Sequence, residues 1–206
     1  MIDTKQKILD TAERLFGEQG YAATSLRQVI AAAEVNIAAV HYHFGSKEDL
    51  LDAVLSRKAG PVTRARMEWL SRVEAEAGVG PPDVEGVLES FLMPTAEMAQ
   101  SNPTFVRLMG RMLNEGMMTQ IVERHFRESA MRFVGALMRA VPHLGQEELM
   151  WRVHFMVGAM AHTMTGKPIL RVAGMPDDAD FPTRMRRLVK FLGAAFRAPA
   201  EVEEKK

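Results

Sequence analysis

Hydrophobic positions follow helical spacing along almost the whole chain, and the period-two alternation of strands is rare. In the first segment, apolar residues recur at i, i+1, i+4, i+7 and i+8, which places them on one face of a helix over residues 4–19. These residues are Ile8, Leu9, Ala12, Leu15 and Phe16. We therefore predict an all-α fold.

Side chains that cap helix N-termini precede the next three apolar segments. The predicted caps are Ser25 with Gln28, Asn36, and Ser46 with Asp49, and they open helices over 26–33, 37–44 and 46–58. Helices this short are not stable alone, so they must share one small core. Short helices joined by a tight turn predict a helix-turn-helix domain over residues 1–50, linked onward by helix 46–58. The expected core residues are Ile8, Leu15, Phe16, Leu26, Val29, Ile30, Val40, Phe44 and Leu50.

The remainder reads as one larger helical domain over residues 51–198, which we expect to bind a ligand and to dimerise. Its predicted helices continue to about residue 77 and then cover 84–100, 103–115, 117–141, 146–165 and 183–196. Gly60-Pro61 predicts a kink or break in the helix that begins at 46. The polar tail 199–206 is expected to be disordered.

Composition excludes some chemistry but does not by itself favour DNA. The chain has no cysteine, which removes disulfides, thiolate metal sites and cysteine nucleophiles. Its 26 basic and 26 acidic residues balance, and residues 1–60 contain seven basic and eight acidic side chains. DNA-binding proteins usually carry a basic footprint, so any argument for DNA must rest on where residues lie.

Targeting and membrane signals are not found in the sequence. The N-terminal residues have no apolar signal core, and the longest apolar stretch, about 153–164, is too short to cross a bilayer. We expect a cytoplasmic protein with no membrane partner.

A helical-bundle enzyme is the rival class. Di-iron bundles use Glu-x-x-His pairs, and none of the six histidines has a glutamate three residues before it. His154 and His162 share a helix face, but two helical turns separate them by about 12 Å, too far for one metal. Zincin, P-loop and nucleophile-elbow motifs are missing too. We therefore expect no catalytic residue, metal or cofactor.

The segment 35–51, Val-Asn-Ile-Ala-Ala-Val-His-Tyr-His-Phe-Gly-Ser-Lys-Glu-Asp-Leu-Leu, resembles the recognition helix and following turn of the TetR family of transcriptional repressors. Gly20-Tyr21 and residues 24–29 resemble it too, so the likeness covers roughly residues 5–55. Segments 102–111 and 151–162 look like the PsrA-type, fatty-acid-responsive branch. Where the family usually has glycine, before the recognition helix, this chain has Glu34, and a positive φ there would cost about 1 kcal/mol.

The outward face of a recognition helix must be slim or polar to enter a major groove about 12 Å wide. Small side chains on helix 37–44 let the backbone approach, His41 and Tyr42 project beyond the Val40/Phe44 line, and the N-terminus of helix 26–33 suits a phosphate. The resemblance implies contacts for His43 and Lys47. The candidate DNA contacts are Thr24, Ser25, Arg27, Asn36, Ala38, Ala39, His41, Tyr42, His43 and Lys47. The alternative is that Tyr42, His43 and Lys47 are ordinary surface residues.

One such surface recognises DNA weakly, so we expect a homodimer on a palindromic operator. The candidate interface is helix 146–165, apolar nearly all round, together with helix 183–196. The alternative is that helix 146–165 is the buried centre of its own domain.

Methionines are concentrated in the C-terminal half, and methionine adapts to irregular apolar shapes. This suits a small apolar ligand that relieves repression, and the resemblance implies a fatty acid or acyl-CoA. The candidate ligand contacts are Arg107, Leu108, Arg111, Met112, Phe126, Met160 and His162. Core packing is the alternative for the methionines, and a surface role for the charged residues. A constitutive DNA-binding scaffold without a ligand also stays open.

Overall fold

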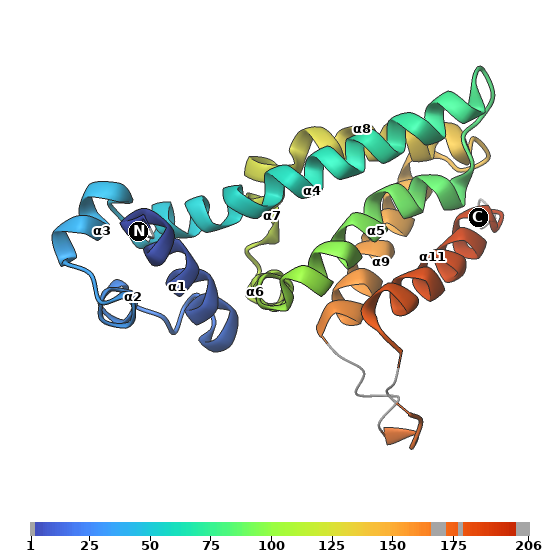
Figure 1. Cartoon of the computed structure of the whole chain (residues 1–206). Helices are drawn as coiled ribbons and strands as arrows, with labels where there is room; N and C mark the ends of the chain where they lie inside the picture. Colours follow the sequence, from blue (N-terminus) through green and yellow to red (C-terminus); the bar gives the residue numbers. More distant parts are fainter. Residues whose placement is uncertain (1–2, 166–171, 177–178, 201–206) are drawn as a thin grey trace, which may run out of the picture. The chain divides into compact units, whose positions relative to one another are not determined.

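The computed structural model describes residues 3–165, 172–176 and 179–200, and every regular element in them is helical (Figure 1). This confirms the all-α prediction. The elements are α1 (Thr4–Gln19), α2 (Leu26–Ala33), α3 (Ile37–His43), α4 (Lys47–Ala77), α5 (Val84–Ser101), α6 (Pro103–Asn114), α7 (Met118–Ile121), the π-helix η1 (Val122–Phe126), α8 (Arg127–Ala140), α9 (Gln146–Thr165) and α11 (Phe181–Arg197).

The predicted capping residues are confirmed at all three helix starts. Ser25 and Gln28 form a reciprocal capping box, in which the Gln28 side chain accepts from Ser25 N at 2.7 Å. Asn36 Oδ1 accepts from Ala38 N at 2.9 Å. Ser46 Oγ accepts from Asp49 N at 3.0 Å, and Asp49 Oδ2 accepts from Ser46 N at 3.3 Å. Each contact satisfies a backbone donor that the first helical turn leaves open.

The expected break at Gly60-Pro61 is not seen, because α4, which is 31 residues long, runs through both residues without interruption. Pro61 has no N–H and removes one backbone hydrogen bond. Buried apolar side chains hold the helix on both sides of it: Ala59 precedes it, and Val62, Leu70 and Val73 follow it. Their burial outweighs the loss of a single bond.

The segment expected as one helix over 117–141 is helical from 118 to 140, but it is divided into α7, the π-helix η1 and α8. Ile121 is buried in one hydrophobic core and Phe133 in another. The wider turn of η1 falls where the chain passes from the first core to the second, so the change of helix type coincides with a change of packing partner.

Contacts divide the chain into two compact units, and this division differs from the expected boundary at residue 50. Unit 1 contains residues 1–62 and 98–126, and unit 2 contains residues 63–97 and 127–206. The first segment of each unit includes part of α4. The tail expected to be disordered, 199–206, lies mostly outside the described residues.

In unit 1, α1 packs against α2, α3 and α6. All nine expected core residues belong to its hydrophobic core, with Leu26 and Ile30 only half-buried. A Cβ on Gly17 would lie 2.8 Å from the Thr104 backbone oxygen, so this glycine permits the close approach of α1 and α6. Helix α6 is therefore part of the same packed body as the helix-turn-helix.

In unit 2, the second half of α4 packs with α5, α8, α9 and α11 around a separate core. Phe91 stacks on Phe133 with ring centroids 4.4 Å apart, and Leu88, Leu137 and Phe196 are completely buried.

Candidate nucleic-acid interface

The turn between α2 and α3 contains Glu34 in the left-handed region, at φ 50° and ψ 47°. It is the only residue other than glycine with positive φ among those the structure describes. The expected departure at this position is therefore confirmed as a strained backbone. The side chain is exposed and makes an ion pair with Lys7 at 3.5 Å, a contact worth little in water.

Helix α3 has one buried and one exposed face. Val40 is fully buried and Phe44, just after the helix, is also buried. On the other face Ala38 and His41 are exposed, Ala39 is half-buried, and Tyr42 is 86% exposed. The helix thus packs by its apolar face and presents small and polar side chains outward, as a groove-reading helix must.

The two histidines of α3 lie differently. His41 Nδ1 is 3.1 Å from the Gly45 backbone oxygen, which fixes the imidazole at the C-terminal end of the helix. His43 is half-buried and its ring lies edge-on to Tyr42, with centroids 5.2 Å apart. His43 thus supports the exposed Tyr42 ring from one side.

The candidates at the start of α2 have different surroundings. Thr24 is 1% exposed, and its hydroxyl donates to Gly20 O at 2.8 Å, so its side chain is structural and out of reach of DNA. Ser25 Oγ donates to Gln28 Oε1 at 2.8 Å within the capping box. Arg27 is exposed and has no ion-pair partner among the described residues. Of these three, Arg27 has the side chain best placed for a phosphate.

Lys47 begins α4, and its ammonium lies 4.2 Å from the centroid of the Tyr21 ring. Tyr21 in turn packs edge-on against Phe16, with centroids 5.4 Å apart. A cation over an aromatic face is stabilised by the ring quadrupole. Tyr21 therefore holds Lys47 in place, and the sequence alone gave no signal for this contact.

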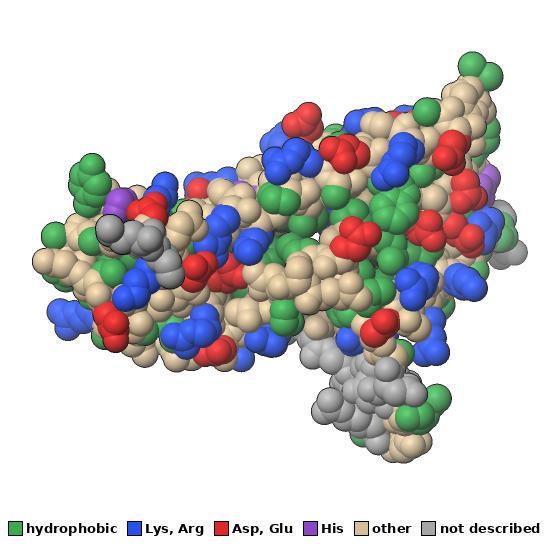
Figure 2. Space-filling model, viewed as in Figure 1, with side chains coloured by type: hydrophobic (Ala, Val, Ile, Leu, Met, Phe, Trp, Pro, Cys, Tyr) green, Lys and Arg blue, Asp and Glu red, His purple; other side chains and the backbone are tan. Residues whose placement is uncertain are grey.

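Charges of both signs are interspersed on the face of unit 1 seen in Figure 2, without a broad basic field. This agrees with the neutral composition. The candidate DNA contacts are therefore individual groups on α2, α3 and the start of α4.

The structure does not bring the seven ligand candidates to one place. Leu108 and Met112 are completely buried in the core of unit 1, and Phe126 packs against it. Arg107 Nη2 donates to Thr104 Oγ1 at 3.0 Å, and Arg111 Nη2 donates to Glu18 O at 2.8 Å. The other two candidates, Met160 and His162, belong to unit 2, where Met160 is half-buried and His162 is exposed.

The sequence analysis did not predict two buried charged residues. Glu13, on α1, accepts from Arg57 Nη2 of α4 and from Asn102 Nδ2, and the same Asn102 accepts from Phe105 N at the start of α6. Through these contacts Glu13 connects α1 with α4 and with the start of α6 in unit 1. The only sequence signal is its position beside the apolar residue Ala12.

The second is Arg66, on the part of α4 that belongs to unit 2. Arg66 Nε donates to Phe91 O at 2.9 Å and Arg66 Nη2 to Thr95 Oγ1 at 2.9 Å. Burial lowers the pKa of Arg66 to about 10, which leaves the guanidinium charged at neutral pH. No periodicity argument identifies a single arginine that points inward.

None of the helices in the described ranges combines the length and apolarity needed to cross a bilayer.

Together, the fold and the outward face of α3 define a helix-turn-helix DNA-binding regulator.

Comparison with known families agrees with this class. The model for "Bacterial regulatory proteins, tetR family" matches residues 8–54, and the model for "Tetracyclin repressor-like, C-terminal domain" matches residues 87–195. Since the second alone covers more than half of the chain, the protein belongs to the TetR family of transcriptional regulators. It is therefore a DNA-binding regulator and not an enzyme.

Similarity to curated proteins is concentrated in part of the chain. The regulator AcrR of Shigella flexneri is 32% identical over 95 residues, which are 46% of this chain and 41% of AcrR. The repressor Rv3405c of Mycobacterium tuberculosis is 46% identical over 57 residues, 28% of this chain and 30% of that protein. The chain thus matches less than half of the length of each of these relatives.

Solved structures share the fold along nearly the whole chain. A TetR-family regulator from Shewanella sp. PV-4 has a TM-score of 0.63 at 17% identity, covering 94% of this chain and 96% of its own. The fatty acid degradation regulator FadR from Bacillus halodurans has a TM-score of 0.65 at 16% identity, covering 96% and 98%. At this identity the likeness concerns the fold, and the PsrA-type branch has no specific support from it.

Proposed function

We propose that the protein is a homodimeric repressor that binds palindromic operator DNA through α2 and α3 and releases it when a small apolar ligand binds. The observation that carries the proposal is the division of α3 into a buried face, with Val40, and an open face, with Ala38 and Tyr42. A two-fold dimer would present two such helices to half-sites one helical turn apart, about 34–36 Å, or a multiple of it.

An exposed aromatic stripe on unit 2 supports the dimer. On α9, Trp151 is 54% and Phe155 63% exposed, and their rings stack with centroids 5.9 Å apart. On the adjoining α11, Phe191 is 67% exposed. Gly158 continues the stripe on α9, and a Cβ there would meet nothing within 4 Å. Large apolar side chains in such a row are typical of a protein interface, and a second copy of α9 and α11 would cover them.

The expected apolar ligand is a fatty acid or acyl-CoA, and two features support this class. Half-buried methionines, among them Met160 and Met164, pack against the core of unit 2. The FadR structure of the same fold belongs to a regulator of fatty acid degradation.

Selection from a random pool of duplex DNA tests the proposal. We expect the protein to enrich an inverted repeat, and long-chain acyl-CoA to reduce its affinity for that repeat. Ala38→Glu adds a carboxylate to the open face of α3 and should weaken binding at least about tenfold, since an unpaired charge at a DNA interface costs more than 1 kcal/mol. Ala75→Glu makes the same change at an exposed position of α4 in unit 2 and should bind like the wild type.

Failure to enrich any repeat, or equal binding by the Ala38→Glu and Ala75→Glu variants, would contradict the DNA-binding surface. An enriched repeat whose affinity is indifferent to acyl-CoA would reject that ligand class and leave the DNA surface standing.

A further inference from the structure

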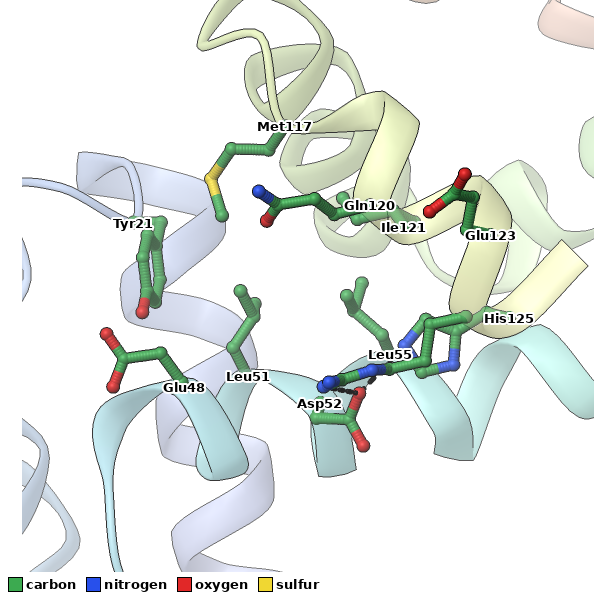
Figure 3. A pocket seen from close by; sticks show the side chains of 11 residues that line it. Tyr21, Glu48, Leu51, Asp52, Leu55, Met117, Gln120, Ile121, Glu123 and His125 are labelled. Carbon is green, nitrogen blue, oxygen red and sulfur yellow. Dashed lines mark hydrogen bonds and ion pairs between the residues drawn. The ribbon is translucent and has the colours of Figure 1, made fainter.

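Unit 1 contains a cavity of about 490 Å³ that the DNA-binding surface does not use (Figure 3). It is bounded by Tyr21 after α1, by the first turns of α4, and by the segment from Met117 to His125, which includes α7 and η1. Its volume falls in the range of about 300–1,000 Å³ of small-molecule sites. None of the seven ligand candidates drawn from the sequence is among its lining residues.

The cavity has an apolar floor. Leu51 and Leu55 from α4 and Ile121 from α7 are buried side chains of its lining, and Met117 lies across from Leu51 in Figure 3. Such a floor suits the hydrocarbon part of a ligand, because contact with it removes apolar surface from water. The cavity is therefore more than a group of charged side chains at the surface.

The acidic side chains that line the cavity differ in whether a basic side chain neutralises them. Asp52 Oδ1 lies 2.9 Å from Arg124 Nη1 and 3.1 Å from His125 Nε2, so its charge is matched from within the cavity wall. Glu48 makes no ion pair with any described residue, and the Tyr21 hydroxyl points toward its carboxylate in Figure 3. With Glu123 as a further exposed carboxylate, the lining has three acidic side chains against Arg124 and His125.

Tyr21 connects this carboxylate to the DNA-binding surface. Burial, and then the negative charge of Glu48, raise the pKa of Tyr21 to about 12, so its hydroxyl stays neutral beside that carboxylate. The face of the same ring supports the ammonium of Lys47, 4.2 Å from the centroid. A change in the charge or position of Glu48 can therefore alter the position of Lys47, because the Tyr21 side chain lies between them.

We propose that this cavity binds an amphiphilic organic cation, with its ammonium group at Glu48 and its hydrocarbon part on Leu51, Leu55 and Ile121. The charge of the lining rejects a carboxylate, so the occupant differs in class from the acidic ligand proposed for unit 2. Its effect on DNA rests on the proposed repressor function.

The bound ammonium competes with the Tyr21 hydroxyl for Glu48 and repels the ammonium of Lys47. Both effects loosen Lys47 at the start of α4, where it is a candidate phosphate contact. The cation consequently lowers DNA affinity, and DNA lowers the affinity for the cation by the same factor.

Three probes with one hydrocarbon chain test the site on the full-length protein: octylammonium, octanol and octanoate. Titration calorimetry without DNA should give the tightest binding for octylammonium, weaker binding for octanol and the weakest for octanoate. Glu48→Gln should weaken octylammonium binding roughly three- to fivefold, the size expected for a partly exposed ion pair, and leave octanol unchanged. Glu18→Gln removes a carboxylate of unit 1 outside the cavity and should behave as the wild type.

Equal binding of the three probes, no binding of octylammonium, or a Glu48→Gln variant that binds it as well as the wild type would overturn the cation site. Circular dichroism checks that the variant is folded, and the comparison of the three probes needs no variant. Because these titrations contain no DNA, their outcome is independent of the proposed function. If octylammonium binds but leaves the affinity for the selected repeat unchanged, the coupling through Tyr21 is rejected.

Discussion

Replacing Glu34 by glycine should stabilise unit 1, because the residue holds a left-handed backbone without being glycine. A left-handed conformation costs a residue with a side chain about 1–2 kcal/mol. Glycine removes this strain but loses about 0.5–1 kcal/mol more chain entropy on folding. The exposed ion pair with Lys7, at 3.5 Å, contributes at most a few tenths of a kcal/mol. The expected gain over the wild type is about 0.5 kcal/mol.

The matched control is Glu34→Gln, which removes the same charge and the same ion pair but keeps the strained backbone. In urea, with a slope of about 2 kcal/mol per molar, Glu34→Gly should unfold at a concentration roughly 0.3–0.5 M above that of Glu34→Gln. Circular dichroism follows the transition, and amide hydrogen exchange over residues 26–44 locates the gain. Both variants should bind DNA roughly twofold more tightly at low salt, since both remove a negative charge beside α3.

A midpoint for Glu34→Gly equal to or below that of Glu34→Gln would refute the reasoning, because the two proteins differ mainly in backbone strain. A rise in both midpoints by the same amount would attribute the effect to charge instead.

Three other variants test separate parts of the account. Lys47→Ala should weaken binding to all DNA sequences alike and lower the slope of log affinity against log salt by about 1, and an unchanged slope would contradict its phosphate contact. Burial raises the pKa of Glu74, but its ion pairs with Arg132 and Arg139 outweigh burial and leave the pKa below the ordinary 4.5. The two ion pairs of Glu74 therefore stabilise the folded state fully at pH values above the ordinary pKa of 4.5. They lose this effect as the pH falls through the lowered pKa of the folded protein. The stability difference between wild type and Glu74→Gln should be present at neutral pH and vanish in acid, where a constant difference would disprove the linkage. Phe155→Glu should convert the proposed dimer to a monomer in analytical ultracentrifugation, and a persistent dimer would exclude that face of α9.

Local rules predicted the helix-turn-helix well, because caps and apolar spacing act within a few residues. Ser25 with Gln28 and the Asn36 cap located the starts of α2 and α3, and the Val40–Phe44 spacing identified the buried face. Glu34 was identified through the resemblance to the TetR family, which usually has glycine at this position, and not through a local rule.

Tertiary packing decided what the sequence could not. The grouping of α6 with the helix-turn-helix depends on Gly17 and on Glu13, whose partner Asn102 is 89 positions away. The burial of Thr24 depends on backbone acceptors at Leu15 and Gly20. The cavity beside Tyr21 is formed by Tyr21, residues 48–55 and residues 117–125, which are far apart in the sequence. The hydrophobic periodicity of these segments does not indicate a cavity.

The central claim is that the open face of α3 lies in the DNA major groove. Replacing Tyr42 by a photoreactive phenylalanine derivative and irradiating the complex with the selected repeat tests it most directly. The account predicts cross-links to bases within each half-site, and none from the same derivative at Val79, an exposed position of unit 2. Cross-links from position 79 instead of 42, or equal cross-linking of 42 to a scrambled duplex, would contradict it.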